Sequence, residues 1–154
     1  MNALAFGGHP VAGCKAFQNF YNALQSIWKN AGIGGANDFE KIQTAYARFY
    51  QSHESEIGHY FRTLYHIVRF VDQSPMTDEE KHNYEKFLRA QLSSSELLLL
   101  FYNGLSKYGW KKFKPLIEKY ALLEQVPEPL LLDSNNWNLY EPTAFQDRIT
   151  LTTL

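Results

Sequence analysis

The stretch LRAQLSSSELLLLFYNGLSKYG, residues 88–109, decides the fold of this chain. Leucine runs without interruption from Leu97 to Leu100, and aromatic residues follow directly. Ser93 and Glu96 stand three residues apart just before this run, which is the spacing of a capping box at a helix start. A helix that is apolar on nearly every side is buried within its domain. The stretch therefore predicts a central helix that begins immediately after Ser93.

Two more helices are expected upstream, because apolar residues recur there at steps of three and four. The first covers about Cys14–Asn30, and the second covers Asp38–Val71. The second exceeds the usual length of ~8–20 residues and contains Gly58. We expect a long helix with a weak point at QSHESEIG, residues 51–58. A break into two helices at that point is the alternative.

A further helix precedes the central one. Thr77 and Glu80 form a second capping-box pattern after Pro75. Helical spacing then predicts a helix that ends near Leu92. Its expected buried face comprises Tyr84, Phe87, Leu88, Gln91 and Leu92, with Glu85, Lys86 and Arg89 on the solvated side.

The C-terminal part divides at Val126. PLIEKYALLEQV, residues 115–126, predicts a last amphipathic helix, whereas residues 127–154 show no helical period. RITLTTL, residues 148–154, alternates like a short strand without a visible partner. The predicted fold is all-α, a single bundle of about five helices with an irregular tail. We divide the chain into a flexible segment 1–14, a helical domain 15–126 and an extended or partly disordered tail 127–154.

Composition narrows the function. The 154 residues suit one domain, and a net charge of −1 gives no overall electrostatic drive toward nucleic acid. The single cysteine, Cys14, excludes an internal disulfide and fits a reducing compartment, so a cytoplasmic location is expected. No apolar run approaches the ~20 residues that span a bilayer. The sequence holds no metal-binding or phosphate-loop motif, so no cofactor or metal is expected.

The first candidate site is a basic stripe in IGHYFRTLYHIVRF, residues 57–70. His59, Arg62, His66 and Arg69 fall on one face of a helix. Such a stripe can bind phosphate, RNA or a carboxylate. The alternative is that it is simply the solvated face of an amphipathic helix.

A second candidate is RFYQSH, residues 48–53. An Arg and a His separated by four residues on a helix is the spacing of the metal-independent HEPN ribonucleases. Arg48 and His53 would then be the catalytic pair at a ribose phosphate. Phe49 stands where those enzymes usually carry a polar residue. A helical ribonuclease is therefore the alternative function.

A third candidate is a buried polar network of Gln91, Asn103, Glu96 and Arg89. Gln91 and Asn103 could tie neighbouring helices together, because an unpaired buried amide costs ~1–3 kcal/mol. For Arg89 the default interpretation remains a surface ion pair.

A fourth candidate is SKYGWKKFKPLIEK, residues 106–119, where lysines alternate with aromatic residues. It could stack nucleobases or contact anionic lipid headgroups. A solvated turn with extended lysines explains the same pattern.

Several ordered blocks resemble the AbiC-like phage abortive infection proteins. These blocks are IGHYFRTLYHIVRFVD (57–72), YxxFLRAQLSSSELLLLFYNGLS (84–106) and KFKPLIEKYALLEQV (112–126), with KAFQNFYNAL (15–24) upstream. The matching positions are His59, Tyr60, Arg62, Tyr65, Arg89, Gln91, Leu92, Ser93, Glu96, Asn103 and Lys114. Longer members of that family look as though they carry membrane-spanning segments, which this chain lacks.

The resemblance implies a bacterial anti-phage factor that stops an infected cell before progeny emerge. We expect a sensor or interaction module that recognises a phage or host protein, with membrane contact only through segments outside this chain. The alternatives are the ribonuclease and the soluble part of a membrane-perturbing effector. A homodimer through Asp38–Val71 is a further expectation.

Overall fold

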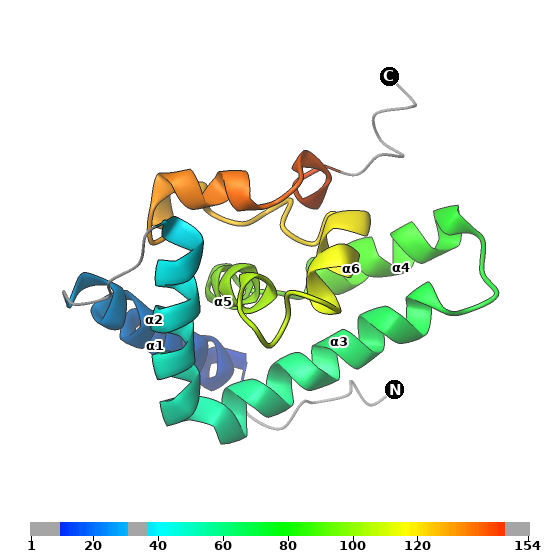
Figure 1. The fold of residues 1–154 in the computed structure, drawn as a ribbon. Coiled ribbons are helices and arrows are strands. Elements are labelled where there is room, and N and C mark those ends of the chain that lie inside the picture. Colours follow the sequence, from blue (N-terminus) through cyan, green and yellow to red (C-terminus); the bar gives the residue numbers. More distant parts are fainter. Residues whose placement is uncertain (1–9, 31–36, 147–154) are drawn as a thin grey trace.

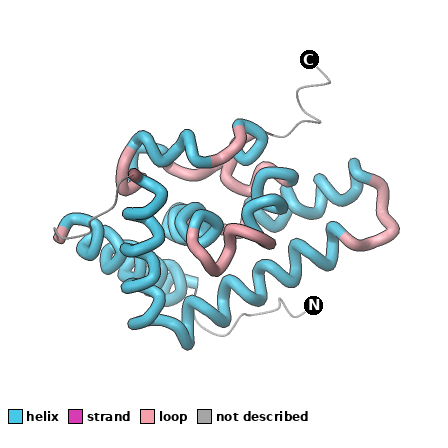
Figure 2. Tube along the Cα trace, in the orientation of Figure 1, coloured by secondary structure: helices cyan, strands magenta, loops and turns pink. Residues whose placement is uncertain are grey.

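The computed structural model of the chain describes residues 10–30 and 37–146. Its helices are α1 (Pro10–Lys29), α2 (Asp38–His53), α3 (His59–Asp72), α4 (Asp78–Arg89), α5 (Ser94–Leu105) and α6 (Phe113–Lys119). Figure 2 shows helices and loops and no strand within these ranges. The predicted all-α fold is confirmed. Residues 1–9 and the strand-like residues 148–154 lie outside the described part.

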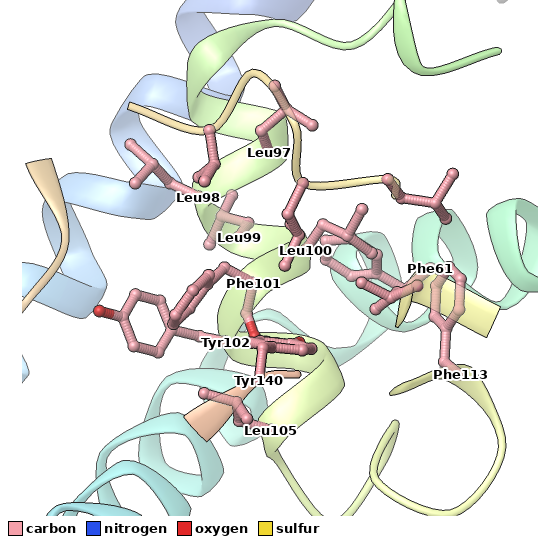
Figure 3. Packing of buried hydrophobic residues seen from close by; sticks show 14 of the residues in the cluster. Phe61, Leu97, Leu98, Leu99, Leu100, Phe101, Tyr102, Leu105, Phe113 and Tyr140 are labelled. Atoms are coloured by element: carbon pink, nitrogen blue, oxygen red, sulfur yellow. The ribbon is translucent and has the colours of Figure 1, made fainter. Parts of the chain in front are cut away.

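The central position of α5 is confirmed. In Figure 1 it is seen nearly end-on, with α1 and α2 on one side, α3 below, and α4 and α6 on the other side. Every residue from Leu97 to Leu105 is buried. Figure 3 shows these side chains meeting Phe61 of α3, Phe113 of α6 and Tyr140 of the tail. Each fully buried leucine contributes roughly 1.5–3 kcal/mol.

Both predicted capping boxes are confirmed. The Ser93 hydroxyl accepts from the backbone N–H of Glu96 at 3.3 Å, and the Glu96 carboxylate accepts from the N–H of Ser93 at 2.7 Å. Thr77 and Glu80 make the same reciprocal pair at the start of α4. Each cap satisfies N–H groups that the helix cannot satisfy itself, worth about 1 kcal/mol.

The long helix expected over residues 38–71 is present as two α-helices joined by a π-helical segment, Glu54–Gly58. The chain stays helical, but α3 leaves in a different direction from α2 (Figure 1). The bend lies at the predicted weak point. Gly58 is buried there, and a Cβ on it would stand 2.5 Å from the hydroxyl oxygen of Tyr50.

The predicted buried face of α4 is wrong in part, because Leu88 and Leu92 do pack against the core but its other members do not. Tyr84 and Phe87 are 58 % and 70 % exposed, whereas Glu85 and Arg89 are buried. Arg89 donates to the carbonyl oxygens of Tyr120 and Ala121 at 3.3 and 3.1 Å and pairs with Glu124. These acceptors satisfy a buried guanidinium, so tertiary pairing overrides the apolar pattern.

The last helix is shorter than expected. α6 ends at Lys119, and Ala121 has a φ of 50°, a left-handed conformation that no helix continues through. Two buried backbone carbonyl groups of this turn, those of Tyr120 and Ala121, are the ones that Arg89 binds. Leu123 then donates its N–H to the carbonyl oxygen of Ala144 in the tail at 3.0 Å.

The tail runs across one side of the bundle (Figure 1) and contains three short 3₁₀ helices, Glu128–Leu130, Ser134–Leu139 and Pro142–Ala144. Tyrosine hydroxyls fasten it. Tyr21 donates to the carbonyl oxygen of Leu130, and Tyr102 donates to the Asn136 side chain at 2.9 Å. The tail thus supplies part of the core wall.

Candidate functional site

The predicted basic stripe lies on α3, and its four side chains are exposed. These residues are His59, Arg62, His66 and Arg69. Within the described part of the chain, none of them makes a side-chain hydrogen bond or an ion pair. Their steps of three, four and three residues keep them on one helical face. The stripe is therefore a row of cationic and titratable side chains that no carboxylate neutralises.

A cavity of about 200 Å³ lies beside this stripe. It is bounded by residues of α2, the π-helical segment, α3, α5 and the α5–α6 connection. The lining residues are Tyr50, Gly58, Phe61, Arg62, Tyr65, Asn103, Tyr108, Lys112 and Phe113. Arg62 belongs both to the stripe and to the cavity, so it links the predicted surface to an enclosed space.

Aromatic rings form the walls of the cavity. Tyr50 and Tyr108 stack with ring centroids 3.8 Å apart and planes inclined by 22°. Tyr65 meets Phe113 edge to face, with centroids 5.6 Å apart. Because Gly58 has no side chain, the Tyr50 hydroxyl can approach its Cα. This close approach holds the Tyr50 ring against the π-helical segment.

Two cations reach the cavity from different elements. Arg62 comes from α3 and Lys112 comes from the residue just before α6, and both are exposed. The guanidinium of Arg62 lies close to Gly58 of the cavity lining, since its Nη2 would be 3.5 Å from a Cβ on that glycine. Neither cation has an ion-pair partner among residues 10–30 and 37–146. The cavity thus combines an apolar wall with unneutralised positive charge.

The pKa of the Tyr50 hydroxyl depends on its burial and on the charges around the cavity. Burial raises its pKa above the ordinary value of 10.0, and the charges of Glu54 and Tyr108 act in the same direction. The charge of Arg62 acts in the opposite direction. The phenol therefore stays protonated at neutral pH and can donate a hydrogen bond into the cavity.

Asn103 supplies a buried amide at the cavity. It is 3 % exposed, and its Nδ2 donates to the hydroxyl of Tyr46 at 2.8 Å. Its backbone carbonyl accepts from the hydroxyl of Ser106 at 2.7 Å. These bonds fix the amide on the last turns of α5. Asn103 does tie α5 to α2, but through Tyr46 and not through Gln91.

The other members of the predicted polar network lie apart. Gln91 is exposed, because α4 ends at Arg89 and the turn carries Gln91 away from the core. Glu96 completes the cap of α5 and accepts from the Tyr60 hydroxyl at 2.8 Å. Arg89 serves the turn after α6. These contacts form separate helix-to-helix links and not one network.

Arg48 and His53 point to different surroundings. Five positions on one α-helix turn a side chain by about 140°. Arg48 lines a second, larger hollow of about 440 Å³ together with Tyr50 and Tyr108. His53 instead packs against Phe20 of α1, with ring centroids 5.1 Å apart. Within one copy of the chain, Arg48 and His53 thus have different neighbours.

Of the residues that line the cavity, only Arg62 and Asn103 were individually predicted as site residues. Tyr108 and Lys112 lie in the lysine-rich stretch 106–119, so that pattern contained a usable signal. The sequence contained no such signal for Tyr50, because its position fits the usual polar and apolar pattern of an amphipathic helix. Its place at the cavity follows from its stacking on Tyr108 of the α5–α6 connection.

A search of the described helices finds none that is both long and apolar enough to cross a membrane. Comparison with models of protein families matches residues 52–130 to the family described as "putative phage abortive infection protein". The match covers about half of the chain and includes α3, α4, α5 and α6. Every residue that lines the cavity, except Tyr50, lies within it. No curated protein and no solved structure matches this chain.

Proposed function

We propose, on the premise that this chain belongs to the phage abortive infection family, that it acts as the recognition module of an anti-phage response. In this role it binds a phage or host component and passes that event on to the rest of the response. The binding surface is the exposed face of α3 that carries His59, Arg62, His66 and Arg69. The role requires selective binding and no catalytic group.

The observation that supports this proposal most is that α3 gathers four basic side chains without a carboxylate partner on one helical face, whereas three other cations of the described residues are paired. Arg89, Lys114 and Lys119 are each paired with a carboxylate, on Glu124, Glu118 and Asp72 respectively. The four α3 side chains have no such partner among the described residues. A row of unneutralised cations next to a cavity favours an acidic partner surface, because complementary charge raises the association rate.

The test is a plaque assay with bacteria that carry the gene. The double variant His59→Ala/Arg62→Ala removes two exposed side chains that do not belong to the buried core of the described residues. We expect it to lose most of its protection while its helical circular dichroism and melting temperature stay unchanged.

The matched control is Lys29→Ala/Lys86→Ala, which removes two exposed cations from α1 and α4. This variant should protect as the unchanged protein does. If a folded His59→Ala/Arg62→Ala protein still blocks phage at full strength, α3 is not the recognition surface.

A further inference from the structure

The cavity between α2, α3 and α5 offers a ligand more specific contacts than the open stripe does. We propose that it binds a single nucleotide, meaning one nucleobase carrying at least one phosphate. This inference rests on the proposed function, since it names a small ligand that the recognition module would sense.

Arg62 and Lys112 supply the phosphate contacts. They approach the cavity from α3 and from the segment before α6, so a bound anion is contacted by two elements. A guanidinium donates two parallel hydrogen bonds to phosphate oxygens, and an ammonium adds a point charge. Lys114, which lies two residues further on, is paired with Glu118 and is not available. The positive charge is thus concentrated at the cavity.

Tyr50, Tyr108 and Tyr65 supply a face for the base. The stacked Tyr50–Tyr108 pair forms one wall, and Tyr65 lies with Phe113 at the cavity as well. Stacking of a base on an aromatic side chain contributes ~1–3 kcal/mol. An aliphatic phosphate ester would leave these rings without a flat partner, so the walls favour a heterocycle.

Asn103 supplies an acceptor for the edge of the base. Its Nδ2 is already bonded to Tyr46, which fixes the orientation of the amide. The amide oxygen has no hydrogen-bond partner among the described residues, and the residue is 3 % exposed. An amide oxygen accepts from an exocyclic amino group or a ring N–H of a base. This oxygen is not one of the fully buried side-chain atoms that lack a partner among the described residues, so a ligand can reach it, and a base with a donor at that position is favoured over one without.

The size of the cavity limits the ligand. Its volume of about 200 Å³ is below the ~300–1,000 Å³ of drug-sized sites. The space therefore encloses only part of one nucleotide, leaves the rest at the surface, and excludes a stacked run of nucleotides. The larger hollow on the Arg48 side shares the Tyr50 and Tyr108 rings, but there Glu54 offsets part of the positive charge of Arg48 and Lys107, whereas no carboxylate lines the smaller cavity.

The experiment is isothermal titration calorimetry of the full chain with each of AMP, GMP, CMP and UMP. Inorganic phosphate and adenosine serve as separate arms for the two halves of the ligand. We expect at least one monophosphate to bind with a dissociation constant below 1 mM, and both half-ligands to bind at least tenfold more weakly. Arg62→Ala and Lys112→Ala should each weaken binding at least tenfold.

Two matched controls remove exposed cations that do not line the cavity. Lys86→Ala removes a cation of α4, and Lys111→Ala removes the residue next to Lys112. Both should bind as the unchanged protein does. A nucleotide that binds equally well to Arg62→Ala and Lys112→Ala overturns the assignment, as does the absence of binding by any monophosphate at 5 mM.

The outcome separates this inference from the proposed function. If no nucleotide binds while His59→Ala/Arg62→Ala still loses protection, the nucleotide is excluded and the recognition role stands. If a nucleotide binds through Arg62 and Lys112 while that double variant protects fully, the cavity assignment stands and the anti-phage recognition surface is elsewhere.

Discussion

The hydroxyl group of Tyr140 rests on the Cα of Gly104, so close that a Cβ on the glycine would stand 2.2 Å from the hydroxyl oxygen. The same hydroxyl donates to the carbonyl oxygen of Phe101 at 2.8 Å. A side chain of the tail thus penetrates to the backbone of the central helix. This contact makes the packing of α5 depend on residues far along the chain.

Gly104→Ala should destabilise the protein by about 1–3 kcal/mol, because the added methyl group collides with Tyr140 and with the Cδ1 of Ile117 at 2.7 Å. Urea unfolding measures the loss. In a Tyr140→Phe background the same change should cost less, since the nearest colliding atom is gone. Equal costs in the two backgrounds would show that the tail is not seated on α5.

Glu85→Gln should remove a pH dependence of stability. Burial, and then the charge of Asp72, raises the pKa of Glu85 from its ordinary value of 4.5 to about 8. Between these values the unfolded chain releases the proton and the folded protein keeps it. Stability therefore falls as pH rises, by up to about 1.4 kcal/mol per pH unit.

Urea unfolding at pH 5 and pH 8 checks this prediction. The advantage of Glu85→Gln over the unchanged protein should grow between the two pH values. Glu79→Gln, an exposed change on the same helix, should leave the slope as it is. Parallel profiles for Glu85→Gln and the unchanged protein would contradict a buried, protonated Glu85.

Arg89→Ala should be far more damaging than Glu124→Ala. The arginine is 3 % exposed and its loss leaves two backbone carbonyl groups without donors, at about 1–3 kcal/mol each. The glutamate side chain is 37 % exposed, so water replaces it at little cost. Thermal melts of the two variants compare these losses directly. Similar melting temperatures would mean that the turn after α6 does not depend on Arg89.

Gly58→Ala should impair the cavity more than the fold. The new methyl group would displace the Tyr50 hydroxyl from its position 2.5 Å away and disturb the Tyr50–Tyr108 stack. Tyr50 is only partly buried, so its ring can move outward. We expect at least a fivefold loss of nucleotide affinity in calorimetry with a small change in melting temperature. Unchanged affinity would show that the stack does not contact the ligand.

Purified protein should leave total RNA intact, because Arg48 lines one hollow while His53 packs on Phe20. Gel electrophoresis after incubation without metal is sufficient. Cleavage that disappears in His53→Ala, while Arg62→Ala keeps it, would instead establish the ribonuclease alternative and point to a paired arrangement of two copies.

Local sequence predicted what local chemistry controls. The run Leu97–Leu100 specified a buried helix, and the two capping boxes marked where α4 and α5 begin. The buried face of α4 was not predictable in this way. An apolar pattern predicts that Tyr84 and Phe87 are buried and that Arg89 is exposed. The guanidinium of Arg89 is buried instead, because a turn some thirty residues later presents carbonyl groups to it.

The candidate site was only half predictable for a similar reason. Helical spacing identified Arg62 as part of a row, and Asn103 as a polar residue within an apolar helix. Their shared cavity depends on Tyr50 and Tyr108, which meet because α2 packs beside α5. No spacing rule within one helix predicts that packing.

The π-helical segment Glu54–Gly58 has the effect of one extra residue inserted into a continuous α-helix. Each residue of an α-helix advances the direction of the side chains by about 100°. Deleting one residue there would rotate α3 relative to α2 and swing Arg62 away from Asn103. The direction in which the basic stripe of α3 faces is thus set by the number of residues in this segment. A deletion there would change that direction without replacing any side chain of the stripe.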